Sequence, residues 1–137
     1  MTDQLSSPSE VLGQVLPAIQ SGDIELLTSL CTEDVIFEFP FAPPDRPSMV
    51  QGREAVGRYL AAVPSRVAFE RHSNLEIHQS VNPDVAVVEM TATGTVKDTG
   101  DPYKMSYVVV LTVRDGQIAR YRDYWNPLDA LGASDQR

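Results

Sequence analysis

The chain has very few of the residues that build covalent cross-links or metal sites. Its 137 residues include one cysteine, Cys31, and two histidines. A single cysteine cannot close an internal disulfide, which fits a reducing compartment, and we expect the protein to be cytoplasmic. One thiol and two imidazoles also leave little material for a structural zinc site. We therefore expect no metal site, and we interpret Cys31 as a small buried residue.

Basic residues and long apolar runs are also scarce. Eleven Lys and Arg stand against nineteen Asp and Glu, which gives a net charge of -8. Such a surface repels phosphate, so neither nucleic acid nor an anionic membrane is expected as a partner. No apolar run approaches the roughly 20 residues that span a bilayer. The opening residues, MTDQLSSPSE, lack the basic start and apolar stretch of an export signal.

The material for a folded core is present. A hydrophobic share of 42% over 137 residues is typical of a globular protein long enough to bury a core. We find no repeat, linker or low-complexity tract. The sequence therefore predicts one domain over residues 1–137.

Helix signals are concentrated in the first half of the chain. Ser7 and Glu10 form a capping box, and apolar residues at helical spacing follow. Pro17 is expected to bend this helix and Gly22 to end it. Asp23 is the expected cap of a short second helix. A third helix is predicted over 52–62.

The remaining regular segments are typical of strands, because β-branched and aromatic residues alternate with polar ones. Four prolines in 40–49 predict an irregular loop, and the ending NPLDALG predicts a turn of helix at most. The order of elements predicts an α+β fold, in which a curved antiparallel sheet forms a cone around helices and encloses an apolar pocket. Strands are predicted over 34–39, 66–79, 84–97, 103–114 and 117–125.

Two stretches resemble a known family. FEFPFAPP and GQIARYRDYWNPLDALG resemble the SnoaL-like branch of the nuclear-transport-factor-2-like superfamily. That superfamily includes ketosteroid isomerases, limonene-1,2-epoxide hydrolases, polyketide cyclases and the PhzA/PhzB phenazine proteins. The resemblance covers nearly the whole chain and implies the cone fold. It leaves the activity open, because the same fold carries hydrolases, isomerases, cyclases and non-enzymes.

Comparison with the epoxide hydrolases is the most informative, because the spacing from residue 89 to residue 128 matches theirs. One of their two catalytic aspartates falls on Asp123. Their other four polar site residues fall on Phe37, Phe39, Met90 and Ala92. Since only one polar group is kept, the resemblance argues against epoxide hydrolysis by that mechanism.

The ketosteroid isomerases and the PhzA/PhzB proteins give two further comparisons. The general base of the isomerases corresponds to Phe39 and their tyrosine donor to Val15, so both are lost. Their buried acid falls at or beside Tyr107. PhzA/PhzB proteins place a glutamate where Asp123 stands. A carboxylate at position 123 is therefore the shared element.

These correspondences imply an inward-facing set of residues around Asp123. Alternation along the last strand puts Tyr121 and Trp125 on the same face as Asp123. A plain two-residue turn at 115–116 would set Tyr107 opposite Tyr124, on the outer face. A bulge at the glycine would set Tyr107 opposite Asp123, on the inner face, and we favour it.

A carboxyl among apolar side chains is poorly solvated, so the pKa of Asp123 should be raised. Such a group serves as a general acid or base near neutral pH, with Tyr107 as its partner. The sequence thus favours a cofactor-free isomerase, cyclase or dehydratase of a small apolar, aromatic or polyketide-like molecule. Asp123 could instead be structural, bonded to neighbouring protein groups, and Tyr107 and Tyr121 simple lining.

Two alternatives to an enzyme stay open: a protein that binds a hydrophobic ligand without changing it, and an interaction domain with a vestigial pocket. A homodimer is expected under all three, through an outer sheet face that holds Val108, Val110 and Tyr124.

Several charged residues lie on the strands without a single predicted face. Arg71 could point inward and pair with Asp123, whereas the strand surface is the expected place of His72 and His78. Residues expected on the outer face are Glu89, Arg120 and Arg122.

Overall fold

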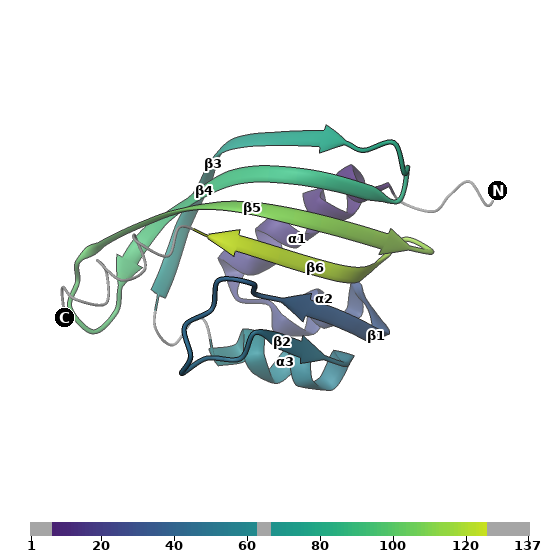
Figure 1. Ribbon diagram of the computed structural model, residues 1–137. Coiled ribbons are helices and arrows are strands. Elements are labelled where there is room, and N and C mark those ends of the chain that lie inside the picture. Colours follow the sequence, from purple (N-terminus) through teal and green to yellow (C-terminus); the bar gives the residue numbers. More distant parts are fainter. Residues whose placement is uncertain (1–6, 63–66, 126–137) are drawn as a thin grey trace.

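A computed structural model describes residues 7–62 and 67–125. Within these ranges no helix combines the length and apolar character needed to cross a membrane. The predicted helical turn over NPLDALG lies outside the described residues. The elements, labelled in Figure 1, are α1 (Pro8–Ser21), α2 (Ile24–Ser29), β1 (Cys31–Glu38), β2 (Met49–Gln51), α3 (Arg53–Ala62), β3 (Val67–Gln79), β4 (Val85–Val96), β5 (Pro102–Arg114) and β6 (Gln117–Trp125).

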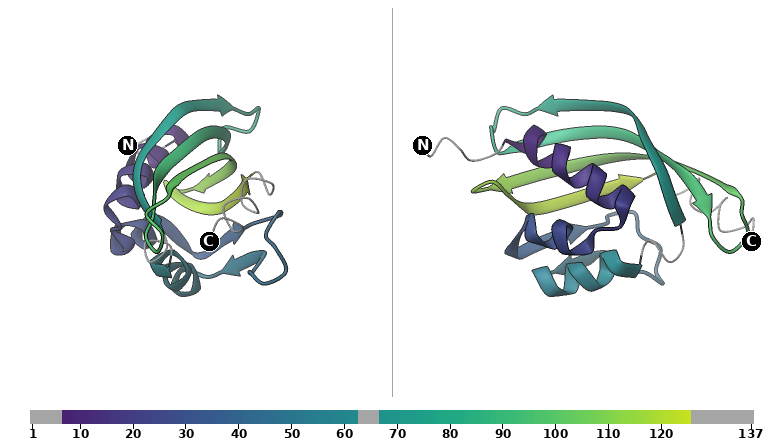
Figure 2. Two further views of the ribbon diagram at one scale, coloured as in Figure 1. Left: turned by 90° about the vertical axis from the view of Figure 1, so that its left-hand side faces the viewer. Right: turned by 180° about the vertical axis from the view of Figure 1, so that it is seen from behind.

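The strands form one curved sheet in the order β2-β1-β6-β5-β4-β3, with the helices on one side of it (Figure 2). Neighbouring strands are antiparallel except β1 and β6, which run parallel. The predicted α+β fold is confirmed. Strand β2 is an addition: it is three residues long and directly follows the proline-rich segment, too short to leave an alternating pattern.

Helix α1 begins and ends where its sequence signals lie. Ser7 caps it with the predicted capping box, and Gly22 ends it with a φ of 73°, a left-handed conformation that glycine adopts without strain. The helix continues through Pro17. This proline has no N–H to bond the carbonyl of Gly13, but both residues are exposed, so water can bond that carbonyl instead. The opposite face packs on the sheet through the buried residues Val11, Leu12, Val15 and Ala18.

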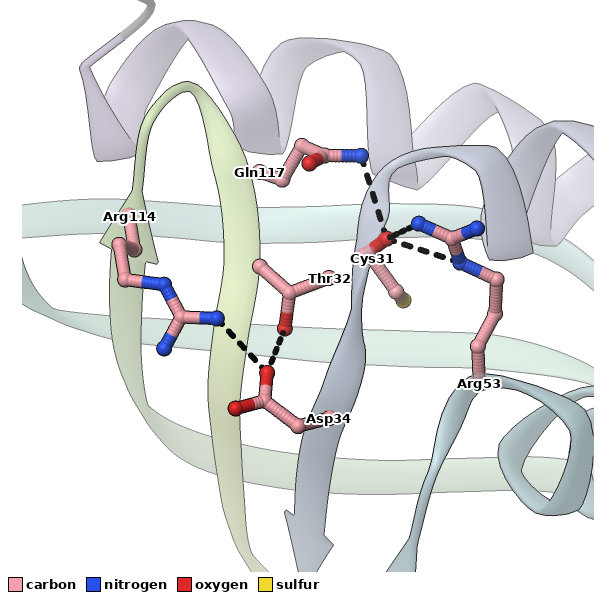
Figure 3. A network of polar contacts seen from close by, with 6 residues as sticks. All are labelled: Cys31, Thr32, Asp34, Arg53, Arg114 and Gln117. Atoms are coloured by element: carbon pink, nitrogen blue, oxygen red, sulfur yellow. Dashed lines mark hydrogen bonds and ion pairs between the residues drawn. The ribbon is translucent and has the colours of Figure 1, made fainter.

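Polar contacts at the start of β1 explain why this strand begins three residues before its predicted start (Figure 3). Arg53 donates to the carbonyl oxygen of Cys31 through Nε at 3.1 Å and Nη2 at 2.7 Å, and Gln117 donates to the same oxygen at 3.2 Å. Asp34 accepts from Arg114 at 2.7 Å, and this bond lowers the pKa of Asp34. The contacts join β1 to α3 and to the β5–β6 hairpin.

The β5–β6 turn differs from the predicted one. Asp115 and Gly116 both have positive φ, 54° and 78°, as a two-residue type I′ turn requires. The bulge lies further along: Thr112 pairs with Arg120 and Val113 with Ile118, so Ala119 is the extra residue. The prediction of a bulge at the glycine was therefore wrong.

The register that results changes the partner of Tyr107 but keeps its face. Tyr107 pairs with Trp125, and Asp123 pairs with Val109, so the predicted Tyr107–Asp123 pairing was wrong by two residues. A shift of two leaves every side chain on the same face of the sheet. Tyr107 and Asp123 are diagonal neighbours on the inner face.

Candidate functional site

A cavity of about 360 Å³ lies between the helices and the inner face of the sheet. Its walls combine side chains of α1, α2 and α3 with those of β1, β3, β4, β5 and β6. All eight residues singled out from the sequence line it: Phe37, Phe39, Met90, Ala92, Tyr107, Tyr121, Asp123 and Trp125.

Asp123 lies in this cavity with an unsatisfied oxygen. Its Oδ1 is inaccessible to solvent and has no hydrogen-bond partner among the described residues. The residue as a whole keeps part of its surface, as expected for a side chain that borders a cavity. Burial raises the pKa of Asp123 to about 8. Near pH 7 the carboxyl is therefore mostly protonated, and a small change in its surroundings can move the proton.

The hydroxyl of Tyr107 bonds to another tyrosine and not to Asp123. This hydroxyl lies 2.6 Å from the hydroxyl of Tyr103, a cavity residue that the sequence analysis did not single out. Burial is the main cause that raises the pKa of Tyr107, followed by Tyr103 and the charge of Asp123. Tyr107 therefore stays protonated at any physiological pH and can act only as a hydrogen-bond donor or acceptor.

Aromatic rings form the wall around Asp123. Phe37 and Tyr121, paired across β1 and β6, stack with centroids 4.8 Å apart. Burial and the charge of Asp123 raise the pKa of Tyr121. Phe39 stacks on Tyr59 at 4.9 Å and tilts against Trp125 at 5.9 Å. A flat ring is the ligand shape that such a wall accommodates best.

On β3 the structure reverses the surface placement expected for His72 and excludes the open possibility that Arg71 pairs with Asp123. The predicted irregularity at residues 73–74 is present, but a second bulge, at Glu70, shifts the alternation. As a result His72 lines the cavity, whereas Arg71 is exposed and cannot pair with Asp123. Gln20 of α1 lies 3.0 Å from Nδ1 of His72, and burial lowers the pKa of His72. A bulge of this kind gives no clear sequence signal.

The remaining charged residues lie where the sequence placed them. Arg122 donates to Glu38 at 2.9 Å, away from the cavity. His78 is exposed and lies 2.8 Å from Glu89.

Glu76 joins these two, and their ligand atoms lie within 4.8 Å of one another. All three are exposed, and no feature of the described structure beyond their proximity points to an ion.

Cys31 is buried, and burial raises its pKa to about 11, so it remains an inert thiol.

Two curated proteins are similar in sequence to this chain. The chain is 32% identical to the protein YesE of Bacillus subtilis over 98% of its own length and 93% of that protein. It is also 32% identical to a PhzA/B-like protein of Pseudomonas aeruginosa, over 90% of this chain and 87% of the other. The resemblance to PhzA/PhzB proteins is thereby confirmed.

Solved structures carry the same fold. A Bacillus subtilis protein with an inferred isomerase activity superposes with a TM-score of 0.89 at 32% identity, covering 95% of this chain and 94% of the other. An inferred polyketide cyclase of Pseudomonas putida superposes with a TM-score of 0.78 at 19% identity, over 93% and 97% of the two chains. At that identity the second likeness concerns the fold alone.

The family model described as the SnoaL-like domain matches residues 13–121. This range holds most of the helices and strands and most of the cavity walls. The chain therefore belongs to the family of SnoaL-like domains.

Proposed function

We propose that the protein is a cofactor-independent acid/base enzyme, of the isomerase, cyclase or dehydratase type, that acts on a small aromatic or polyketide-like molecule. The observation that carries the proposal is the Oδ1 of Asp123, which has no hydrogen-bond partner among the described residues and belongs to a largely apolar cavity. A carboxyl oxygen that no described residue bonds keeps its hydrogen-bonding capacity for a ligand. Its raised pKa suits it to both giving and taking a proton near neutral pH.

An isomerisation illustrates the proton movements. The ionised form of Asp123 removes a proton from a carbon next to a carbonyl, and an enol or enolate forms. The protonated Asp123 then returns the same proton to another carbon of the conjugated system, so no proton is gained or lost overall. In this proposal the hydroxyl of Tyr107, which lines the same cavity, donates a hydrogen bond to the carbonyl oxygen.

A ligand carrier is the second candidate. The walls around Asp123 are largely apolar, and four of the five polar positions of the epoxide-hydrolase site hold Phe37, Phe39, Met90 and Ala92. A cavity with so few polar groups can hold a hydrophobic molecule without changing it.

Deuterium exchange separates the two functions without knowledge of the natural substrate. In D₂O the enzyme is expected to speed the exchange of the α-protons of 2-tetralone, a bicyclic ketone, followed by ¹H NMR. The Asp123→Asn variant should lose this acceleration by about 10²-fold or more, because an amide cannot accept the proton.

Asp98→Asn, an exposed change in the β4–β5 turn, is the matched control and should keep the wild-type rate. Equal exchange rates for wild type and Asp123→Asn would contradict the enzyme proposal. Binding of the ketone by the wild type without any exchange would favour the carrier.

A further inference from the structure

The loop of residues 39–48 is held in place despite its lack of regular structure. The amide of Phe39 donates to the carbonyl of Ser48 at 2.8 Å, and the amide of Arg46 donates to Pro43 at 3.0 Å. The ring of Phe41 packs edge-on against Tyr124 of β6, with centroids 5.4 Å apart. In Figure 1 the loop, drawn in dark blue, lies beside the end of β6. The prolines of this loop further limit its conformations.

Arg46 of this loop lines the cavity and is also exposed to solvent, which places it at the rim. Among the described lining residues it is the only Lys or Arg. Three arginines on β5 and β6 form ion pairs: Arg114 with Asp34, and Arg120 and Arg122 with Glu38. No ion pair among the described residues involves Arg46, and its neighbour Asp45 does not line the cavity.

The chemistry near this rim suits a ring with a negative group. The loop starts at Phe39, whose ring contacts Tyr59 and Trp125 in the cavity wall. Since the chain carries a net charge of -8, an unpaired guanidinium at a cavity rim is a local exception that attracts anions. Asp123 does not oppose this attraction at neutral pH, because it is mostly protonated there.

We propose that the ligand of the cavity is an apolar, ring-containing carboxylic acid, whose carboxylate is bound by Arg46 at the rim while its ring lies against Phe39, Tyr59 and Trp125. Guanidinium and carboxylate match in shape and form paired hydrogen bonds. The single charge of Arg46 balances a carboxylate better than it balances a phosphate, which carries more negative charge. This inference rests on the proposed function in one respect, because it takes this cavity as the ligand site. What it adds is the chemical class of the ligand.

A matched pair of probes tests the charge alone: 2-naphthoate and 2-naphthamide, which share one shape and differ in charge. Binding is read from the fluorescence of Trp125, the only tryptophan of the chain and a cavity residue. The wild type is expected to prefer the acid by about fivefold or more. Arg46→Gln should abolish that preference by weakening the binding of the acid far more than that of the amide, whereas Arg46→Lys should keep part of it.

Arg71→Gln is the control, because it removes the same charge from an exposed site outside the cavity. It should leave the preference for the acid intact. Raising the salt concentration should weaken naphthoate binding and spare naphthamide. Equal affinities of the wild type for the two probes, or an equal effect of Arg46→Gln and Arg71→Gln, would overturn the inference.

The outcome is independent of turnover. A preference for the acid that depends on Arg46, found together with an absence of proton exchange in 2-tetralone, would leave this inference standing and remove the enzyme. Exchange that depends on Asp123, found without any preference for the acid, would support the enzyme and remove this inference.

Discussion

Replacing Asp123 with asparagine is expected to make the protein more stable, by an amount that grows with pH. The pKa of this carboxyl is about 8 in the folded protein, against about 3.9 for an unfolded aspartate. Between these values the folded state binds more protons than the unfolded state, so the free energy of unfolding falls as the pH rises. Below about pH 4 the carboxyl is protonated in both states, so its burial costs no free energy of ionisation. Asparagine carries no such penalty at any pH.

The expected gain at pH 8 is about 2 kcal/mol. The full pKa difference corresponds to roughly 5 kcal/mol, which is an upper limit. Water in the cavity lowers the penalty, and the new amide group also needs partners. Thermal unfolding of both proteins at pH 4 and pH 8 measures the effect, which should be a rise in Tm of about 6 °C at pH 8 and little change at pH 4.

Asp98→Asn serves again as the control, since its exposed side chain should give no pH-dependent difference. A variant of Asp123 that is less stable than the wild type at pH 8 would show that the carboxylate has partners. A stabilising change that removes activity is the pattern expected of a functional residue, because such a residue is kept at a cost to stability.

Gly94→Ala is expected to be strongly destabilising. Gly94 pairs with Phe69 on β3 and with Tyr103 on β5. A Cβ at this position would overlap the carbonyl oxygen of Ala68 and lie 3.0 Å from the Cα of Phe69. Because these are backbone atoms beside the bulge at Glu70, the strands must move apart. We expect a loss of about 3 kcal/mol and a fall in Tm of about 10 °C.

The same change should disturb the site. The rings of Phe69 and Tyr103 meet edge to face at 5.7 Å, and Tyr103 holds the hydroxyl of Tyr107. Gly13→Ala is the matched control, because Gly13 is an exposed helical residue with open space around it. It should stabilise the protein by about 0.5–1 kcal/mol. Similar Tm values for the two variants would show that β3 and β4 can separate without strain.

The sequence located the fold and most of the cavity because alternation and capping are local signals. The strands β3 to β6 lie within a residue or two of their predicted bounds. The inner face predicted for Tyr107 was correct, but the extra hairpin residue was expected at the glycine and lies at Ala119 instead. Neither the face nor the partner of Tyr107 could be derived with certainty from the sequence, because Ala119 gives no signal that distinguishes it from its neighbours.

His72 and Arg46 were out of reach for related reasons. The bulge at Glu70 exchanges the faces of Arg71 and His72, and it is fixed by the packing of β3 on β4. Arg46 lies in a proline-rich loop without periodicity, so only the closure of the loop onto β6 brings it to the cavity. Alternation patterns predict faces within regular strands, and both residues depend on departures from regularity.

The pKa of Asp123 tests the account most directly. Its side-chain carboxyl carbon can be followed by ¹³C NMR from pH 3 to pH 10 and assigned by its absence in Asp123→Asn. The account predicts a single titration with a midpoint near pH 8. A midpoint near pH 4 would mean that the carboxylate is solvated or bonded in the folded protein, and it would contradict both the isolated carboxyl and the proton chemistry built on it.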